Sequence, residues 1–149
     1  MTERLSTTRD INASPEAVYA AISDVTRMGE WSPECHTCVW HEGFDGPVVG
    51  ATFDGHNRND QLEWTTQGKV IEAAPGRSFV FECSSQGFHF ATWGYSIEPT
   101  ADGCRVTEWT EDLRPPKAIE AAKLRHGVDR PVRNAETMSV TLERLAAAL

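Results

Sequence analysis

The chain has 149 residues, and 14 lysines and arginines against 22 aspartates and glutamates give it a formal net charge of −8. This length is enough for one domain with a sizeable core. An acidic chain without a cluster of basic residues is poorly suited to bind nucleic acid or an anionic membrane surface.

The chain also lacks targeting and membrane signals. No apolar run approaches the roughly 20 residues of a membrane span. Residues 1–18 carry charged and hydroxyl side chains where an export signal has an apolar stretch. Four cysteines without an export signal are typical of a reduced compartment. We therefore expect one cytoplasmic domain, residues 1–149, that binds no nucleic acid and does not insert into a membrane.

The N-terminal third predicts one strand and two short helices. Residues 3–11 alternate and contain β-branched side chains, which favours a strand. Ser14 and Pro15 are typical of a helix start. Four apolar residues follow at helical spacing: Val18, Ala21, Ile22 and Val25. A second short helix is predicted over 26–30, ending before Pro33.

The middle of the chain predicts strands separated by turns rich in Gly, Asn, Asp and Pro. The six predicted strands are 37–42, 51–58, 62–73, 78–84, 88–98 and 103–113. Residues 117–126 predict a weak helix or lid that ends at Gly127. Asp129 and Pro131 then begin a long helix whose apolar stripe is Val132, Ala135, Met138, Ser139, Leu142, Leu145, Ala146 and Leu149.

These elements predict an α+β fold. Successive strands with short connections pair antiparallel, and only the C-terminal helix is long enough to cover a seven-stranded sheet. One helix cannot fill the concave face of such a sheet, so we expect a space between them.

Four stretches of the sequence carry a resemblance to a known group. They are "EAVYAAISDVTRMGEWSPEC", "VGATFDGHNRN", "WTTQGKVIEAAPGRSFVFE" and "TWGYSIEPTADGCRVTEWTE", followed by the terminal helix. Together they resemble the START/Bet v 1-like (SRPBCC) superfamily, and more narrowly its bacterial polyketide cyclase/dehydrase and lipid-transport-like branch. The resemblance implies one helix-grip domain over residues 1–149: a curved seven-stranded antiparallel sheet around a long C-terminal helix, with two short helices after the first strand.

The segment "WSPECHTCVWH" contains a C-x-x-C spacing that could signal zinc or redox chemistry. However, the residues after Cys38 predict a strand, in which Cys38 and His41 point to opposite faces. Cys83 and Cys104 stand alone on other strands. We therefore predict no metal and no cofactor. The resemblance places this turn at the cavity mouth, where Trp31 either touches ligand or packs the short helices.

Strand alternation predicts which side chains face the space between sheet and helix. His56 is predicted to point outward unless a bulge at Gly55 reverses the strand, and His89 is predicted to point inward. In the last strand Cys104 implies an inward Glu108, although Trp109 favours the opposite parity. The expected cavity residues are Trp31, Cys35, Phe53, Asn57, Trp64, Phe81, Trp93, Tyr95, Glu108 and Met138.

Three functions are compatible with this pattern. The first is a binding protein, monomer or homodimer, for an apolar or aromatic small molecule of polyketide or lipid type. The second is a cyclase or dehydratase with Glu108 as base, Asn57 or Tyr95 as donor and His56 in reserve. No catalytic spacing motif supports it. The third is a chaperone regulator or interaction module, which would need an exposed apolar patch. An inward Glu108 is expected to have a raised pKa because its burial is costly.

Overall fold

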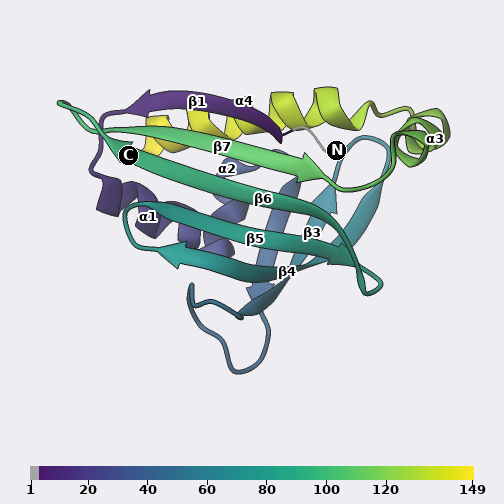
Figure 1. Ribbon diagram of the computed structural model, residues 1–149, viewed down its shortest axis with the longest axis horizontal. Coiled ribbons are helices and arrows are strands. Elements are labelled where there is room, and N and C mark those ends of the chain that lie inside the picture. Colours follow the sequence, from purple (N-terminus) through teal and green to yellow (C-terminus); the bar gives the residue numbers. More distant parts are fainter. Residues whose placement is uncertain (1–3) are drawn as a thin grey trace.

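The computed structural model describes residues 4–149 and has the expected helix-grip fold (Figure 1). Its strands are β1 (Arg4–Ile11), β2 (Cys35–Trp40), β3 (Thr52–Arg58), β4 (Glu63–Ala74), β5 (Ser78–Ser85), β6 (Phe88–Pro99) and β7 (Cys104–Asp112). Its helices are α1 (Pro15–Ser23), the 3-10 turn η1 (Val25–Arg27), α2 (Met28–Trp31), α3 (Pro116–His126) and α4 (Arg130–Ala148). The predicted start of the first strand, residue 3, lies outside the described residues.

The strands form one antiparallel sheet in the order β1-β7-β6-β5-β4-β3-β2. Each strand from β2 to β6 pairs with its successor, and β1 lies at the far edge beside β7. Helix α4 packs against β1 and β7, whereas α1 packs against β5 and β6. The two helices therefore cover different parts of the concave face, and a space is left where neither reaches.

Local chemistry sets the ends of the helices. The Ser14 hydroxyl accepts a hydrogen bond from the Ala17 amide at 3.1 Å, which caps α1. Asp129 caps α4 through the Val132 amide at 3.4 Å. Gly127 ends α3 with a φ of 70°, a backbone conformation that glycine adopts without strain. These caps lie where the sequence predicted them.

The inner face of α4 differs from the predicted apolar stripe. Its buried residues are Asn134, Thr137, Met138, Thr141, Leu142 and Leu145, whereas Val132 is 54% exposed and Leu149 lies at the surface. The prediction was wrong for the first half of the helix, because this half faces the space beside the sheet and not the apolar core. Met138 at the middle of the helix and the second half pack into the interior.

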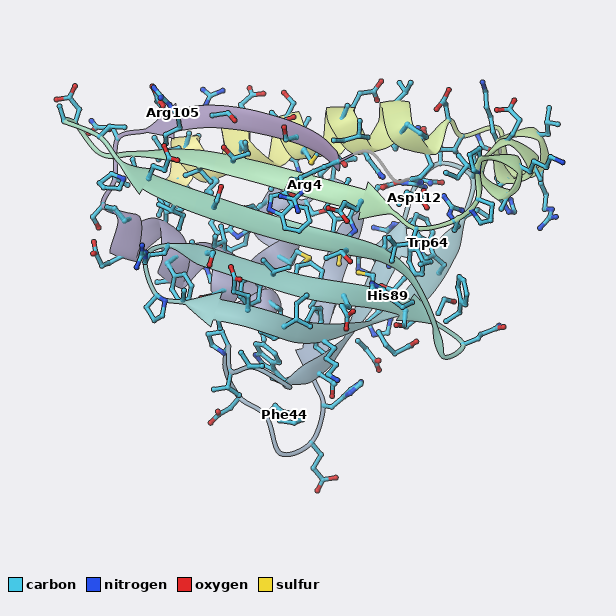
Figure 2. The ribbon with its side chains drawn as sticks, viewed as in Figure 1. Arg4, Phe44, Trp64, His89, Arg105 and Asp112 are labelled. Carbon is cyan, nitrogen blue, oxygen red and sulfur yellow. The ribbon has the colours of Figure 1, made fainter. Side chains whose placement is uncertain are left out.

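Besides a register shift in β4 between Val70 and Glu72, two register shifts change which side chains face the cavity. One lies in β2 between Cys35 and Thr37. The other lies between β5 and β6, where Ser84 pairs with His89 and the preceding pair joins Cys83 to residue 91. A bulge of this kind adds one residue and reverses the faces beyond it. The prediction that His89 points inward was therefore wrong: its ring lies 3.2 Å from Glu82 on the outer face (Figure 2).

An arginine covers an aromatic ring on the outer face of the sheet. The guanidinium of Arg4 lies 3.7 Å from the ring centroid of Trp109 (Figure 2). This contact settles the parity of β7: Trp109 is outward, and Glu108 is inward. Across residues 4–149, no helix is both long and apolar enough to cross a membrane.

Candidate ligand cavity

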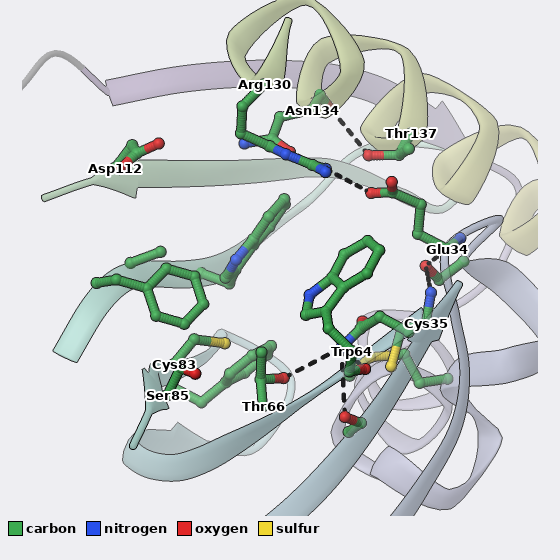
Figure 3. Close-up of a pocket in the computed structure, with 18 of the residues that line it drawn as sticks. Glu34, Cys35, Trp64, Thr66, Cys83, Ser85, Asp112, Arg130, Asn134 and Thr137 are labelled. Carbon is green, nitrogen blue, oxygen red and sulfur yellow. Dashed lines mark hydrogen bonds and ion pairs between the residues drawn. The ribbon is translucent and has the colours of Figure 1, made fainter. Parts of the chain in front are cut away.

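A cavity of about 560 Å³ lies between the concave face of the sheet and the first half of α4 (Figure 3). Its volume falls in the range of about 300–1,000 Å³ that small-molecule sites occupy. Helix α3 and the turn between α2 and β2 complete its border. Aromatic side chains form most of the sheet side: Phe53, Trp64, Phe81, Phe88, Phe90, Trp93 and Tyr95.

The aromatic wall is held by edge-to-face contacts. The rings of Phe53 and Phe81 have centroids 5.4 Å apart at an angle of 70°, a favoured arrangement for aromatic pairs. Phe53 lies directly over Gly68 of the neighbouring strand, where an added Cβ would come within 2.2 Å of the ring. The glycine on β4 therefore lets Phe53 lie flat, which leaves the cavity open above it.

The helix side of the cavity is polar. Arg130, Asn134, Thr137 and Thr141 line it from α4, at spacings of four, three and four residues. This spacing puts them on one helix face. Sequence reasoning missed the row because it searched α4 only for apolar periodicity, although the same helical spacing could have revealed it. The cavity therefore has one aromatic side and one hydrogen-bonding side.

A polar clasp joins three elements at the edge of the cavity. Arg130 Nη1 lies 2.7 Å from Glu34 Oε1, and the Arg130 guanidinium lies 5.5 Å from the ring centroid of Trp64 (Figure 3). Asn59 Nδ2 donates to Glu34 Oε2 at 3.1 Å, and Arg133 is 3.8 Å from the same carboxylate. The contacts tie α4 to the turn before β2 and to the β3–β4 connection.

The most unusual group in the cavity is the carboxyl of Glu108. It is 6% exposed, and its Oε1 atom has no hydrogen-bond partner among residues 4–149. Burial raises the pKa of Glu108 to about 8, and the neighbouring Tyr95 hydroxyl offsets part of this rise. Burial, followed by the proximity of Glu108, also raises the pKa of Tyr95 well above its usual value. As expected from its inward position, Glu108 is mostly a neutral acid at pH 7.

Tyr95 on β6 and Glu108 on β7 are a cross-strand pair, so the two titratable side chains lie next to each other on the inner face of the sheet. Arg133 on α4 is a cation that could have paired with Glu108. Instead, Arg133 contacts Glu34 and Glu136. Glu108 thus borders the cavity, and its Oε1 atom is buried without a partner among residues 4–149.

Most of the predicted cavity residues lie on its surface: Cys35, Phe53, Asn57, Trp64, Phe81, Trp93, Tyr95 and Glu108. Their contact with a ligand remains a prediction. Asn57 is partly committed to the sheet, since its side-chain amide lies 3.3 Å from the Gly55 carbonyl. The structure places His56 on the outer side, 3.3 Å from the Thr65 hydroxyl. It therefore does not reach the same space as Glu108.

Two expected residues are absent from the lining. Met138 and Trp31 are 1% and 4% exposed and belong to the packed interior. The Arg27 guanidinium covers the Trp31 ring at 4.9 Å, so this indole packs the short helices. Met138 lies near the middle of α4 and is buried in the interior. Trp31 was expected at the cavity mouth from the resemblance, with packing as the alternative, and Met138 from the apolar stripe of the helix. An apolar stripe does not distinguish core from cavity.

The two cysteines of the C-x-x-C segment face each other. Their Sγ atoms are 3.3 Å apart, and both residues line the cavity. Regular alternation would put residues three apart on opposite faces, but the bulge after Cys35 restores a common face. Cys83 from β5 also reaches the cavity. The sequence prediction included Cys35 alone.

The chain belongs to the polyketide cyclase / dehydrase and lipid transport family, whose pattern matches residues 2–149. A similar solved structure is the solution structure of the Polyketide_cyc-like protein Cgl2372 from Corynebacterium glutamicum. The two sequences are 36% identical, and the match covers 99% of this chain and 83% of the Cgl2372 chain, with a TM-score of 0.55. A search of curated proteins finds no significant match.

Two more distant structures share the fold. The di-domain ARO/CYC StfQ from the steffimycin biosynthetic pathway has a TM-score of 0.75 at 16% identity, covering 99% of this chain and 50% of that chain. The Aha1 dimer from Colwellia psychrerythraea has a TM-score of 0.69 at 17% identity, covering 99% and 96%. At such identities the likeness shows the fold alone, and fold does not fix function.

Proposed function

We propose that this protein binds an amphipathic small molecule, with an apolar or ring-containing body of polyketide or lipid type, in the cavity between sheet and α4. The observation that carries the proposal is the neutral, buried carboxyl of Glu108 with an unpaired oxygen, set in an aromatic cavity of about 560 Å³. A buried polar atom without a partner is costly, and a ligand hydroxyl or carbonyl would remove that cost.

The two sides of the cavity give the ligand an orientation. Its apolar body lies against Trp64, Phe81 and Trp93, which bury ring surface without requiring directional bonds. Its polar end meets Glu108 and Tyr95, where a protonated carboxyl can donate and its second oxygen can accept. The α4 row supplies further hydroxyl and amide groups. Family membership supports this proposal, because the family description names both polyketide chemistry and lipid transport.

Titration with an apolar fluorescent dye tests the binding role. Trp64→Ala and Trp93→Ala are each expected to weaken dye binding by about 1–3 kcal/mol, the free energy of burying a large apolar group. Trp109→Ala is the matched control, since that ring lies on the outer face beneath Arg4. Equal affinity in the folded double variant Trp64→Ala/Trp93→Ala would exclude this cavity as the binding site.

A second candidate is an enzyme that closes or dehydrates a polyketide chain. The observation that favours it is the pairing of Glu108, whose pKa is raised to about 8, with a Tyr95 hydroxyl that stays protonated. Such a pair could remove a proton next to a carbonyl and stabilise the resulting enolate. Because the base must be ionised, the rate would rise with pH through about 8.

The enzyme role is tested by incubation with a short poly-β-ketone thioester and detection of aromatic product. Glu108→Gln keeps the shape of the side chain and removes the base. If the protein is an enzyme of this kind, the variant loses turnover while its dye affinity is nearly unchanged. If wild type forms no product but binds the dye, the binding role stands alone.

A further inference from the structure

The cysteine pair has a geometry that ligand binding does not require. Cys38 Sγ lies 3.3 Å from Cys35 Sγ and 3.8 Å from the Met28 sulfur. Opposite them, β3 presents Gly55, and a Cβ added there would lie 3.5 Å from Cys35 Sγ and 3.7 Å from Cys38 Sγ. The absence of a side chain at this position leaves the space that the two sulfurs share.

The backbone brings the two residues within the reach of a disulfide. Cys35 pairs with Asn57 and Cys38 pairs with Gly55, so the bulge compresses a separation of three residues to the span of two. Two residues of a strand span about 6.6 Å, close to the upper end, about 6.8 Å, of the Cα separations found in disulfides. In the described sheet β2 is an edge strand that pairs only with β3.

Helix α2 holds the bulge in place. A Cβ added to Gly29 would lie 2.1 Å from the carbonyl oxygen of His36, the residue inside the bulge. The glycine therefore allows the helix backbone to pack directly against β2. The juxtaposition of the two thiols is thus built from three features: a bulge, Gly29 behind it and Gly55 in front of it.

The two thiols differ in the way that a reactive pair requires. Cys35 borders the cavity and is partly exposed, whereas Cys38 is 3% exposed. The Cys38 thiol, followed by the Thr37 backbone, lowers the pKa of Cys35 through hydrogen bonds. Its partner's pKa is raised, and burial raises the pKa of Cys83 to about 12. Cys35 is therefore the thiol that ionises first, and the thiolate is the nucleophile.

We propose that Cys35 and Cys38 are an oxidisable dithiol that a hydroperoxide converts to an intramolecular disulfide in the cavity wall. The Cys35 thiolate attacks the peroxide oxygen, forms a sulfenic acid and releases hydroxide or an alkoxide. The Cys38 thiol then displaces the sulfenic oxygen as water, which forms the S–S bond. Overall, two thiols and hydrogen peroxide give one disulfide and two waters.

The neighbouring residues favour this chemistry over metal binding. Two thiolates need further ligands to hold a zinc ion, and no cluster of three or more Cys, His, Asp or Glu with suitable geometry occurs within residues 4–149. Cys83 lies on β5, with β3 and β4 between it and β2. Cys38 is therefore the resolving thiol that Cys35 meets.

The experiment is oxidation of the reduced full-length protein with a small excess of hydrogen peroxide, followed by thiol blocking, intact mass analysis and peptide mapping. Before blocking, we expect a product about 2 Da lighter. After unfolding and blocking, we expect two blocked thiols in place of four, and a peptide joined through Cys35 and Cys38. Dithiothreitol should restore the starting mass. A Cys35–Cys83 link, a link between two chains, or peroxide oxidation that leaves both thiols of the pair free would overturn the proposal.

Variants distinguish the roles within the pair. In Cys38→Ser the disulfide is lost and the Cys35 sulfenic acid is trapped by dimedone, whereas in Cys35→Ser neither product forms. Cys83→Ser is the matched control, because it removes another thiol of the cavity and leaves the disulfide intact. If a serine variant fails to fold, the peptide map of the wild-type protein still shows whether Cys35 and Cys38 form the disulfide.

Discussion

Glu108 illustrates how one side chain couples stability to pH. Its pKa is raised from 4.5 to about 8 on folding, so the folded protein binds more protons than the unfolded chain between these values. Stability is therefore greatest below pH 4.5 with respect to this group, and this contribution is lost as the pH rises toward 8.

The substitution Glu108→Gln removes that pH dependence. We expect the free energy of unfolding of the variant, relative to wild type, to increase by on the order of 1 kcal/mol per pH unit between about pH 5 and 8. Urea denaturation at several pH values measures it. A constant difference between the two proteins across this range would mean that Glu108 is not buried as described.

At the scale of the residue, prediction from sequence was accurate where pairing is regular. On β3 alternation predicted Phe53 and Asn57 as inward, with reversal by a bulge at Gly55 left open. On β7 the parity of Glu108 stayed open until the structure showed Trp109 on the outer face. Alternation failed at His89, because it contains no information about the bulge that reverses β6. It also gave no sign that Cys35 and Cys38 would meet, since their common face depends on a bulge in β2. Trp31 was left open between two roles that only packing could decide.

At the scale of the element, α4 is the clearest case of a helix with two environments. Its second half packs Leu142 and Leu145 into the core, and its first half presents Arg130 and Asn134 to the cavity. The sequence predicted the position of the helix from its cap and its length. It did not predict the inner face of the first half, because a search for apolar periodicity assumes that every inward residue meets the core.

The clasp between α4 and the turn before β2 should contribute to stability. Arg130 and Glu34 have side chains 22% and 12% exposed, so Arg130→Met leaves a poorly solvated carboxylate. We expect a loss of about 1–3 kcal/mol in the free energy of unfolding. The control is Arg105→Met, since the pair of Arg105 with Asp10 is exposed on both sides and should change stability by less than about 1 kcal/mol. Equal losses in the two variants would contradict the role given to the clasp.

At the scale of the whole molecule, the elements around the cavity differ in how deeply they are packed. In the part of the chain that the structure describes, α3 has no buried residue, and its Leu124 is 81% exposed. Few apolar contacts mean a low free energy of local opening. We expect the amides of α3 to exchange with deuterium much faster than those of α4, and to slow when a dye fills the cavity. Exchange of α3 as slow as that of α4 in the free protein would contradict this.

The fold could be predicted because the sequence pattern indicates seven strands, short connections and one long helix. The cavity depends on two features of its walls. Its volume depends on Gly68 beneath Phe53 and on a polar helix face that does not collapse onto the aromatic wall. The packing of Phe53 on Gly68 is a contact between strands that residue types and spacing alone do not specify, whereas the polar row of α4 could have been found from its helical spacing.

Native mass spectrometry of the protein purified from its own host tests the central claim most directly. The account predicts a complex with one amphipathic small molecule per chain, and its mass shift should diminish in Trp64→Ala/Trp93→Ala and remain in Trp109→Ala. The bare chain mass, unchanged even after addition of an excess of apolar dye to the folded protein, would contradict it.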